Sequence, residues 1–203
     1  MYNWKTVLLT LGVLVGLKIW SPYLVENIKW SYFDVLHQQK ETQLVEDIVL
    51  IDIDEKSLDK YGQYPWPRDI YADIMLDTHY TNTHVFTQVF NQPDRFGGDS
   101  KFAEGLVNRL SILSAAPTSQ KDTGSAPYVK TSVFGGGDIS EAIWAFSGIS
   151  APIKLLQDNT YGVGVTVSTP PLPDTPNFDG TVRSAPLIVS ANDQIYPSVA
   201  LET

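Results

Sequence analysis

An apolar run at the amino terminus is the feature that most constrains how this chain folds. Residues 7–20 read VLLTLGVLVGLKIW, interrupted by Thr10 and Lys18. A helix that crosses a bilayer needs about 20 apolar residues, so the run is long enough only if Lys18 reaches the interface and the helix continues to Leu24. The residues after it contain no Ala-x-Ala-like cleavage site. We therefore predict an uncleaved signal anchor at 6–24, preceded by a cytoplasmic amino terminus at 1–5.

The alternative for this run is a buried amphipathic helix of a soluble protein. Residues 7–17 are apolar on every side, whereas an amphipathic helix shows a polar face. We expect a linking helix at 25–46 after the anchor and a single soluble domain at 47–203. The chain ends directly after the start of a helix at Pro197, so we expect this domain to be cut short at its carboxyl end.

Charge and cysteine content exclude several classes of function. The chain has 23 acidic and 14 basic residues, and a net charge of −9 repels a phosphate backbone, so we expect no nucleic-acid partner. It has no cysteine, which excludes a disulfide, a thiolate metal site and a cysteine nucleophile. We predict no catalytic residue, no resident metal and no cofactor.

Strand and helix patterns alternate along the domain. The β-branched run Ile48–Ile53 predicts a buried strand. We expect further strands at 85–90, 112–116 and 161–168, and helices at 68–78 and 99–110. Such alternation is typical of α/β folds with a mostly parallel sheet between two helix layers, a three-layer arrangement. Residues 182–189 and 194–196 predict an antiparallel hairpin near the carboxyl end.

Three acidic residues, Asp52, Asp54 and Glu55, close the first predicted strand. Ligands of parallel sheets bind beyond the carboxyl ends of the strands, so these acids are candidates for binding a small molecule or a hard cation. A second interpretation is a magnesium-dependent phosphatase with Asp52 as nucleophile, although we find no late carboxylate pair for the metal. A third is structural: one acid caps the next helical turn and another pairs with Arg68.

Trp66, Arg68, Asp179 and Arg183 complete the candidate ligand-binding residues. Arg68 follows a loop that two prolines constrain, and it is expected to pair with Asp52, Asp54 or an anionic ligand. Trp66 lies in the same loop. Asp179 and Arg183 flank a glycine turn before the predicted hairpin, and the alternative for them is a plain turn.

Three blocks of this sequence together resemble the type 2 CHASE domain. The first is DIVLIDIDEKSLDKYGQYPWPRDIYADIM, the second FNQPDRFGGDSKFAEGL and the third NFDGTVRSAPLIVSANDQIYPSVALE. In order, they cover most of residues 47–202. The chain departs from the family pattern in the predicted strand at 85–90, where Thr87 or Gln88 stands in place of the usual aspartate.

The resemblance implies an extracellular sensory domain, found with cyclases and histidine kinases and preceded by a transmembrane helix. We therefore expect a single-pass membrane protein with its domain in the periplasm or outside the cell. The expected partners are the membrane, a small molecule or ion, a kinase or cyclase output domain beyond this chain, and a second copy in a homodimer. The alternatives to sensing are the phosphatase and a non-catalytic structural module.

Overall fold

The computed structural model describes residues 3–41, 45–107, 109–120, 127, 143–167, 185–192 and 194–203. The chain divides into two units after Asp52. The first contains two amino-terminal helices, and the second, which comprises residues 53–171 and 182–203, contains the strands and the remaining helices. Each unit is described by itself.

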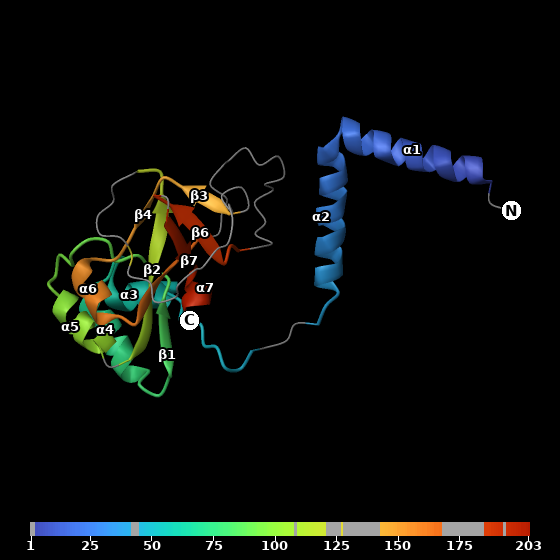
Figure 1. The fold of residues 1–203 in the computed structure, drawn as a ribbon. Coiled ribbons are helices and arrows are strands. Elements are labelled where there is room, and N and C mark those ends of the chain that lie inside the picture. Colours follow the sequence, from blue (N-terminus) through green and yellow to red (C-terminus); the bar gives the residue numbers. More distant parts are fainter. Residues whose placement is uncertain are drawn as a thin grey trace. The chain divides into compact units, whose positions relative to one another are not determined.

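Two helices form the amino-terminal unit. Helix α1 (Trp4–Trp20) begins with Asn3 as its cap, ends at Ser21 and buries none of its residues. Helix α2 (Pro22–Gln38) starts with proline in its first turn, and 101° separates the two axes (Figure 1). Over the described residues, neither helix alone has the length and apolarity of a membrane span, and only the bent pair passes that test together. The expected anchor at 6–24 is therefore divided between two helices.

The predicted strand at Ile48–Ile53 is wrong. These residues are extended but belong to no strand, and the side chains of Ile48, Val49 and Leu50 are 73%, 75% and 89% exposed. A β-branched apolar run favours extended backbone, but a strand also needs a neighbour that completes its hydrogen bonds. No strand of the described sheets includes the run.

Two helices follow, the second of them at the place expected for residues 68–78. Helix α3 (Glu55–Tyr61) starts at Asp54 and ends at Gly62, whose positive φ of 88° suits glycine. Helix α4 (Arg68–Asp77) starts after Pro67 and buries Tyr71, Ala72 and Met75, which lie on one side at helical spacing. Proline before the first helical residue stops α4 from extending backwards.

The central sheet is built around β2 (Leu110–Thr118). Strands β1 (Thr83–Phe86) and β5 (Gly162–Val165) pair with it in parallel, and β4 (Gly148–Ser150) pairs in antiparallel fashion with its last residues. Helix α5 (Asp99–Val107) connects β1 to β2, and α6 (Lys154–Asn159) precedes β5. The predicted alternation of strand and helix is confirmed for β1, α5 and β2 and for α6 and β5, although β1 ends at Phe86 rather than at residue 90.

A second sheet contains β3 (Trp144–Phe146), β6 (Ile188–Ala191) and β7 (Gln194–Pro197). Strands β6 and β7 form the predicted antiparallel hairpin, while β3 pairs with β6 in parallel. Helix α7 (Val199–Glu202) follows β7. The described part of the chain is thus mixed α/β as expected, and it has seven helices. It contains two sheets, whereas the sequence predicted one mostly parallel sheet.

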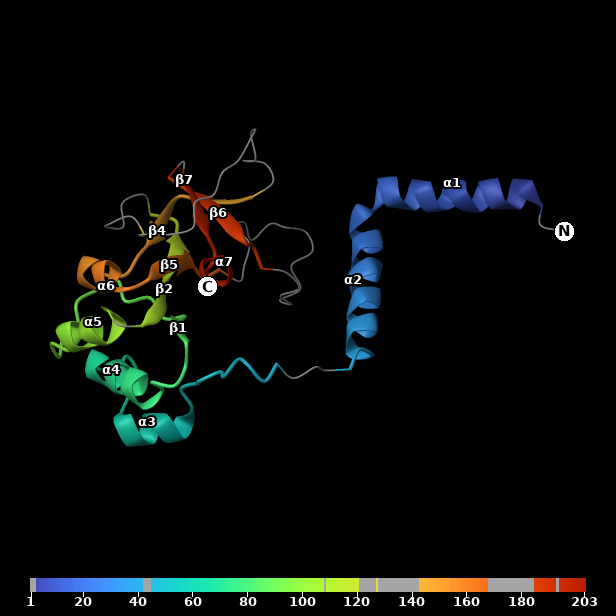
Figure 2. The same ribbon diagram turned by 60° about the horizontal axis from the view of Figure 1, so that its bottom comes forward.

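Most helices of the larger unit pack on one side of its central strand. Both views show α4, α5 and α6 on one side of β2 and α7 on the other (Figure 1 and Figure 2). Helix α7 approaches β5 closely because Gly162 and Gly164 have no side chain: a Cβ on Gly164 would lie 2.4 Å from the Cα of Val199. The core between the sheet and α4–α6 centres on Phe102, Met75 and Leu106, which are fully buried.

Candidate functional site

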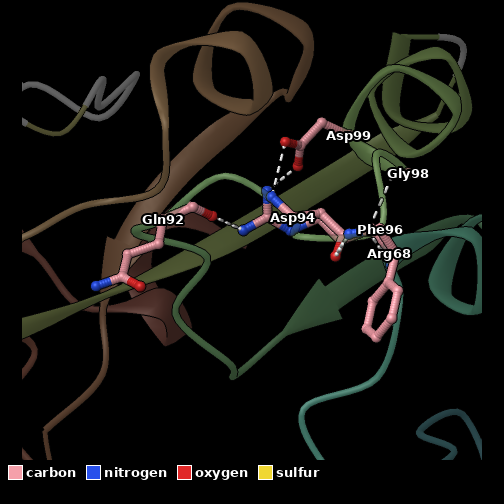
Figure 3. Close-up of polar contacts among 6 residues, drawn as sticks. All are labelled: Arg68, Gln92, Asp94, Phe96, Gly98 and Asp99. Atoms are coloured by element: carbon pink, nitrogen blue, oxygen red, sulfur yellow. Dashed lines mark hydrogen bonds and ion pairs between the residues drawn. The ribbon is translucent and has the colours of Figure 1, made fainter.

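The buried guanidinium of Arg68 is the centre of the polar network in Figure 3. Arg68 is the first residue of α4, and its side chain is 7% exposed. One guanidinium nitrogen donates to the carboxylate of Asp99, at the start of α5, and another donates to the backbone carbonyl of Gln92. The first residues of α4 and α5 and the loop after β1 therefore meet at the guanidinium of Arg68. Its positive charge is neutralised inside the protein.

Asp94 belongs to the same network and binds backbone N–H groups. Its Oδ2 accepts hydrogen bonds from the backbone N–H groups of Arg68 and Gly98, both at 3.0 Å, and its Oδ1 accepts one from Phe96 at 3.1 Å (Figure 3). Burial acts to raise the pKa of Asp94, but these three N–H donors and the charge of Arg68 outweigh it and hold the pKa below its ordinary value. Asp94 thus caps α4 from a distant loop.

Two glycines allow the loop at 94–99 to approach α4. Gly97 has a φ of 83°, a region that residues with a Cβ rarely adopt. A Cβ on Gly98 would lie 2.6 Å from Oδ1 of Asp69 and 2.7 Å from its backbone nitrogen. Asp99 in turn accepts a hydrogen bond from the backbone N–H of Asp94 at 2.9 Å. In the sequence FGGD, Gly97 therefore serves the backbone conformation and Gly98 the close approach to α4.

An aromatic cluster lies beneath the ion pair. Arg68 stacks over the ring of Phe90 at 5.2 Å, and the rings of Phe86, Phe102 and Tyr71 pack against Phe90 and one another at 5.2–6.3 Å. Burial lowers the pKa of Arg68 and raises that of Tyr71. Tyr71 is neutral and Arg68 remains charged at physiological pH, because the lowered pKa of an arginine starts from 12.5.

The predicted partners of Arg68 need a correction. An internal salt bridge was one of our expectations and it is present, but the carboxylate is Asp99 rather than Asp52 or Asp54. Asp54 has the capping role that the structural interpretation gave to one of the acids: its Oδ1 accepts from the N–H of Ser57 at 2.9 Å and from its hydroxyl at 2.7 Å. These two hydrogen bonds, the hydroxyl first, lower the pKa of Asp54.

The remaining residues that the sequence analysis singled out lie in different environments. Trp66 is 6% exposed, donates its indole N–H to the carbonyl of Gly62 at 2.7 Å and stacks on Tyr61 at 5.4 Å. Glu55 and Asp52 are exposed. Asp179 and Arg183 lie outside the described residues. Thr87, which follows the end of β1 directly, is exposed, whereas Gln88 is half-buried.

The structure gives no support to the phosphatase interpretation of Asp52. The phosphatase interpretation requires a strand that ends at Asp52, and the structure has none there. Among the described residues, no group of three histidine or acidic side chains is placed to hold a metal ion. A hollow of about 230 Å³ lies elsewhere, between the ends of α5 and α6, with Arg109, Asp158 and Tyr161 in its wall.

Sequence reasoning missed Asp94 and Asp99 as members of the network. Both occur in the second sequence block, PDRFGGD, but an aspartate next to glycine is also the ordinary composition of a turn. The sequence contains only an indirect signal for these partners. A buried arginine needs a carboxylate, and Asp94 and Asp99 lie just before and at the start of a helix that packs on an aromatic core.

Comparison with known proteins gives one match. A family model described as the CHASE2 domain matches residues 7–203. Neither the curated proteins nor the solved structures contain a significant match.

Proposed function

The chain belongs to the CHASE2 domain family, a family of extracellular sensory domains, and on that premise we propose that it is the sensory input part of a membrane-anchored signal-transduction protein. The observation that carries the proposal is the family match over residues 7–203, which includes most of α1 and all of α2. In this proposal residues 47–203 lie in the periplasm or outside the cell, and residues 1–5 lie in the cytoplasm. A kinase or cyclase domain receives the signal.

The internal pairing of the Arg68 network argues against a catalytic role for its carboxylates. Its carboxylates accept hydrogen bonds from backbone N–H groups and from the guanidinium, so they hold helices α4 and α5 in place. A catalytic carboxylate has to reach a substrate instead. CHASE2 is a sensory rather than a catalytic family, in agreement with this geometry.

We propose that a small molecule or an ion binds near the exposed acids Asp52, Asp54 and Glu55, with Asp179 and Arg183 as further contacts. The exposure of the three acids supports this, since a ligand can reach them. Trp66 and Arg68 belong to the same proposal, but as positioning residues: their polar atoms are bonded to Gly62, Gln92 and Asp99. A ligand changes the output only if it binds one conformation of the domain more tightly than another.

A topology experiment tests the extracytoplasmic location. Alkaline phosphatase is active only outside the cytoplasm, whereas green fluorescent protein delivered by the general secretion route is fluorescent only inside. We expect a phosphatase fusion after Thr203 to be active and a fluorescent-protein fusion at the same residue to be dark. The reverse pattern would contradict the proposed location.

Thermal unfolding tests ligand binding. The full chain in lipid nanodiscs is heated with each member of a panel of divalent cations, amino acids, sugars and organic acids, and a binder raises the unfolding temperature. We expect Asp52→Asn with Glu55→Gln to abolish the shift without lowering the unfolding temperature of the unliganded protein. An unchanged shift in this variant would remove the acids from the binding site.

The structural module remains a second candidate, and the internal satisfaction of Arg68 favours it. It predicts that no compound of the panel raises the unfolding temperature, although the domain is folded and outside the cytoplasm. The two readouts therefore separate the candidates: topology tests the membrane-anchored arrangement, and the temperature shift tests sensing.

A further inference from the structure

A hollow of about 230 Å³ lies where α5 and α6 end and where β2 and β5 begin. The two helices lie side by side in both views (Figure 1 and Figure 2). Its wall includes residues from the last turns of the helices and from the positions directly before the strands: Leu106, Val107, Arg109, Asp158 and Tyr161. All of them belong to the larger unit. We call this feature the α5–α6 hollow.

The α5–α6 hollow is distinct from the Arg68 network. Arg68 binds Gln92 and Asp99 beyond the end of β1. The hollow lies at the starts of β2 and β5 instead, and β1 and β5 both run parallel to β2. Ligands of parallel sheets ordinarily bind at the opposite edge, beyond the carboxyl ends of the strands, so only the side chains of this hollow can make it a site.

The guanidinium of Arg109 supplies a positive charge to the wall. Arg109 is half-buried, and no carboxylate among the described residues forms an ion pair with it. Its charge acts on the neighbouring strand: burial, and after it the charge of Arg109, lowers the pKa of His84. A guanidinium offers a planar fork of N–H donors that fits the two oxygens of a carboxylate. An anionic group in the hollow would therefore have a partner at Arg109.

Asp158 supplies the opposite charge to the same wall. Its two oxygens accept from Nζ of Lys154 at 2.7 and 3.0 Å, but the side chains of Lys154 and Asp158 are 74% and 55% exposed. An exposed pair of this kind stabilises little, and a carboxylate has further lone pairs, so Asp158 can also accept from an ammonium group. In the part of the chain that the structure describes, no ion pair joins Asp158 to Arg109.

We propose that the α5–α6 hollow binds a free α-amino acid with a small apolar side chain. The carboxylate of the amino acid accepts from Arg109, and its ammonium group donates to Asp158. Its side chain lies against Val107 and Tyr161. A zwitterion gives both charges of the wall a partner. A simple organic acid would place a second carboxylate near Asp158, and a simple amine would place a second cation near Arg109.

The size and the apolar part of the wall fit such a ligand. Pockets for drug-sized molecules measure about 300–1,000 Å³. The α5–α6 hollow, at about 230 Å³, is smaller and suits a single small amino acid better than a peptide or a nucleotide. Val107 and Tyr161 are 55% and 43% exposed. An apolar ligand side chain that covers them removes apolar area from water, which favours an apolar amino acid over a polar one.

Thermal unfolding of the full chain in lipid nanodiscs tests the ligand class. The probes are L-alanine, L-valine and L-leucine at millimolar concentration, each with the acid that lacks its ammonium group and the amine that lacks its carboxylate. For L-valine these analogues are isovalerate and isobutylamine. We expect at least one amino acid to raise the unfolding temperature and its two analogues to leave it unchanged, because each analogue leaves one charge of the wall without a partner.

Substitutions test the location. Arg109→Gln and Asp158→Asn should each raise the dissociation constant of the bound amino acid at least about tenfold, since each removes the charge from one contact. The matched control on α6 is Lys154→Gln, which leaves both contacts in place and should bind at least as tightly as the wild type. Asp52→Asn with Glu55→Gln should also retain binding, whereas a compound that binds at those acids loses its effect in that variant.

Several results would overturn the proposal. One is the absence of a shift with all three amino acids, and another is an equal shift with either analogue, which would remove one of the two charges as a contact. Retention of binding in Arg109→Gln, with loss in Asp52→Asn plus Glu55→Gln, would place the amino acid at those acids instead. If Arg109→Gln does not fold, Asp158→Asn and the analogues decide the question. The fusion test of topology does not depend on this site, so the two proposals can fail separately.

Discussion

Arg68 and Asp99 form an ion pair that joins the first residue of α4 to the first residue of α5, although 31 positions separate them in the chain. The pair is almost inaccessible to water, with side-chain exposures of 7% and 16%. Together with Asp94 it connects the loop after β1 to both helix starts. The relative position of α4 and α5 over the sheet therefore depends on buried electrostatics as well as on apolar packing.

Removing Arg68 should destabilise the larger unit strongly. Arg68→Met leaves the carboxylate of Asp99 buried without its cation, and the loss of one partner of a buried pair costs about 3–5 kcal/mol. Urea unfolding of the full chain in detergent, followed by tryptophan fluorescence, measures the change. The matched control is Lys101→Ala, which breaks the exposed pair with Asp73 and should change the free energy of unfolding by less than about 1 kcal/mol.

The double variant Arg68→Met with Asp99→Leu separates ion pairing from packing. If the loss in the single variant arises from the uncompensated carboxylate, the second substitution restores part of the stability. A double variant that is no more stable than Arg68→Met would show instead that the loss arises from the contacts of the arginine stem and the Gln92 carbonyl.

Asp94 should make the free energy of unfolding depend on pH in the acidic range. Its pKa in the folded protein is below the ordinary value of 3.8, so the unfolded chain takes up a proton first as the pH falls. The contribution of Asp94 is therefore complete above about pH 4 and is lost as the pH falls toward the folded pKa. In Asp94→Asn, which keeps one oxygen acceptor, unfolding free energies measured between pH 5 and 3 should vary less steeply than in the wild type. Equal slopes would contradict this assignment.

His84 should make stability depend on pH in a higher range. Burial, and then the charge of Arg109, lower its pKa below the ordinary 6.5. The hydroxyls of Thr78 and Thr81 donate to the carbonyls of Ile74 and Thr78, so at 2.8 and 2.9 Å from Nε2 they act as acceptors, and Nε2 carries the proton.

Nδ1 of His84 is buried and has no hydrogen-bond partner among the described residues, so a second proton there would lack an acceptor. Below about pH 6.5 the unfolded chain takes up this proton before the folded one, and stability should fall as the pH drops toward the folded pKa. Nitrogen NMR of the ring should show the Nε2–H tautomer at pH 7. His84→Gln should remove the dependence; a variant that keeps it would point to another group.

Gly164 should not tolerate a side chain. A Cβ there would lie 2.4 Å from the Cα of Val199 and 2.6 Å from its backbone nitrogen, and backbone atoms cannot rotate away. We expect Gly164→Ala to lower the free energy of unfolding by about 1–3 kcal/mol, the range for overpacked sites.

The matched control for Gly164 is Gly105→Ala in α5. Its new methyl group would meet the sulfur of Met75 at an ordinary 3.5 Å, and alanine favours the helix by about 0.5–1 kcal/mol. A loss of stability in both variants would mean that helix and strand glycines are equally constrained, contrary to the packing of α7 on β5.

The helices of the larger unit could be predicted from the sequence because their determinants are local. Asp54 caps α3 through the backbone three residues later, and Pro67 precedes α4. The hairpin of β6 and β7 is local in the same sense, since its strands are separated by two residues. Each of these features depends on neighbours within one or two turns, which a sequence pattern records.

The tertiary structure alone decided which extended segments became strands. Ile48–Ile53 and Leu110–Thr118 both contain apolar runs, but only the second has strands on its two sides to complete its hydrogen bonds. Pairing is a relation between distant segments, and no property of one segment specifies it. For the same reason the division into two sheets was not predictable.

The sequence by itself indicated that Arg68 would have an anionic partner, offered helix capping as one role of the acids and made a nucleic-acid partner unfavourable; the resemblance of its three blocks implied a sensory domain. Only the tertiary structure selected Asp99 and Asp94 from 23 acidic residues as the partners of Arg68. The physical reason is that electrostatic attraction acts through space over a few ångströms, whereas the order of residues says nothing about which distant ones will lie that close.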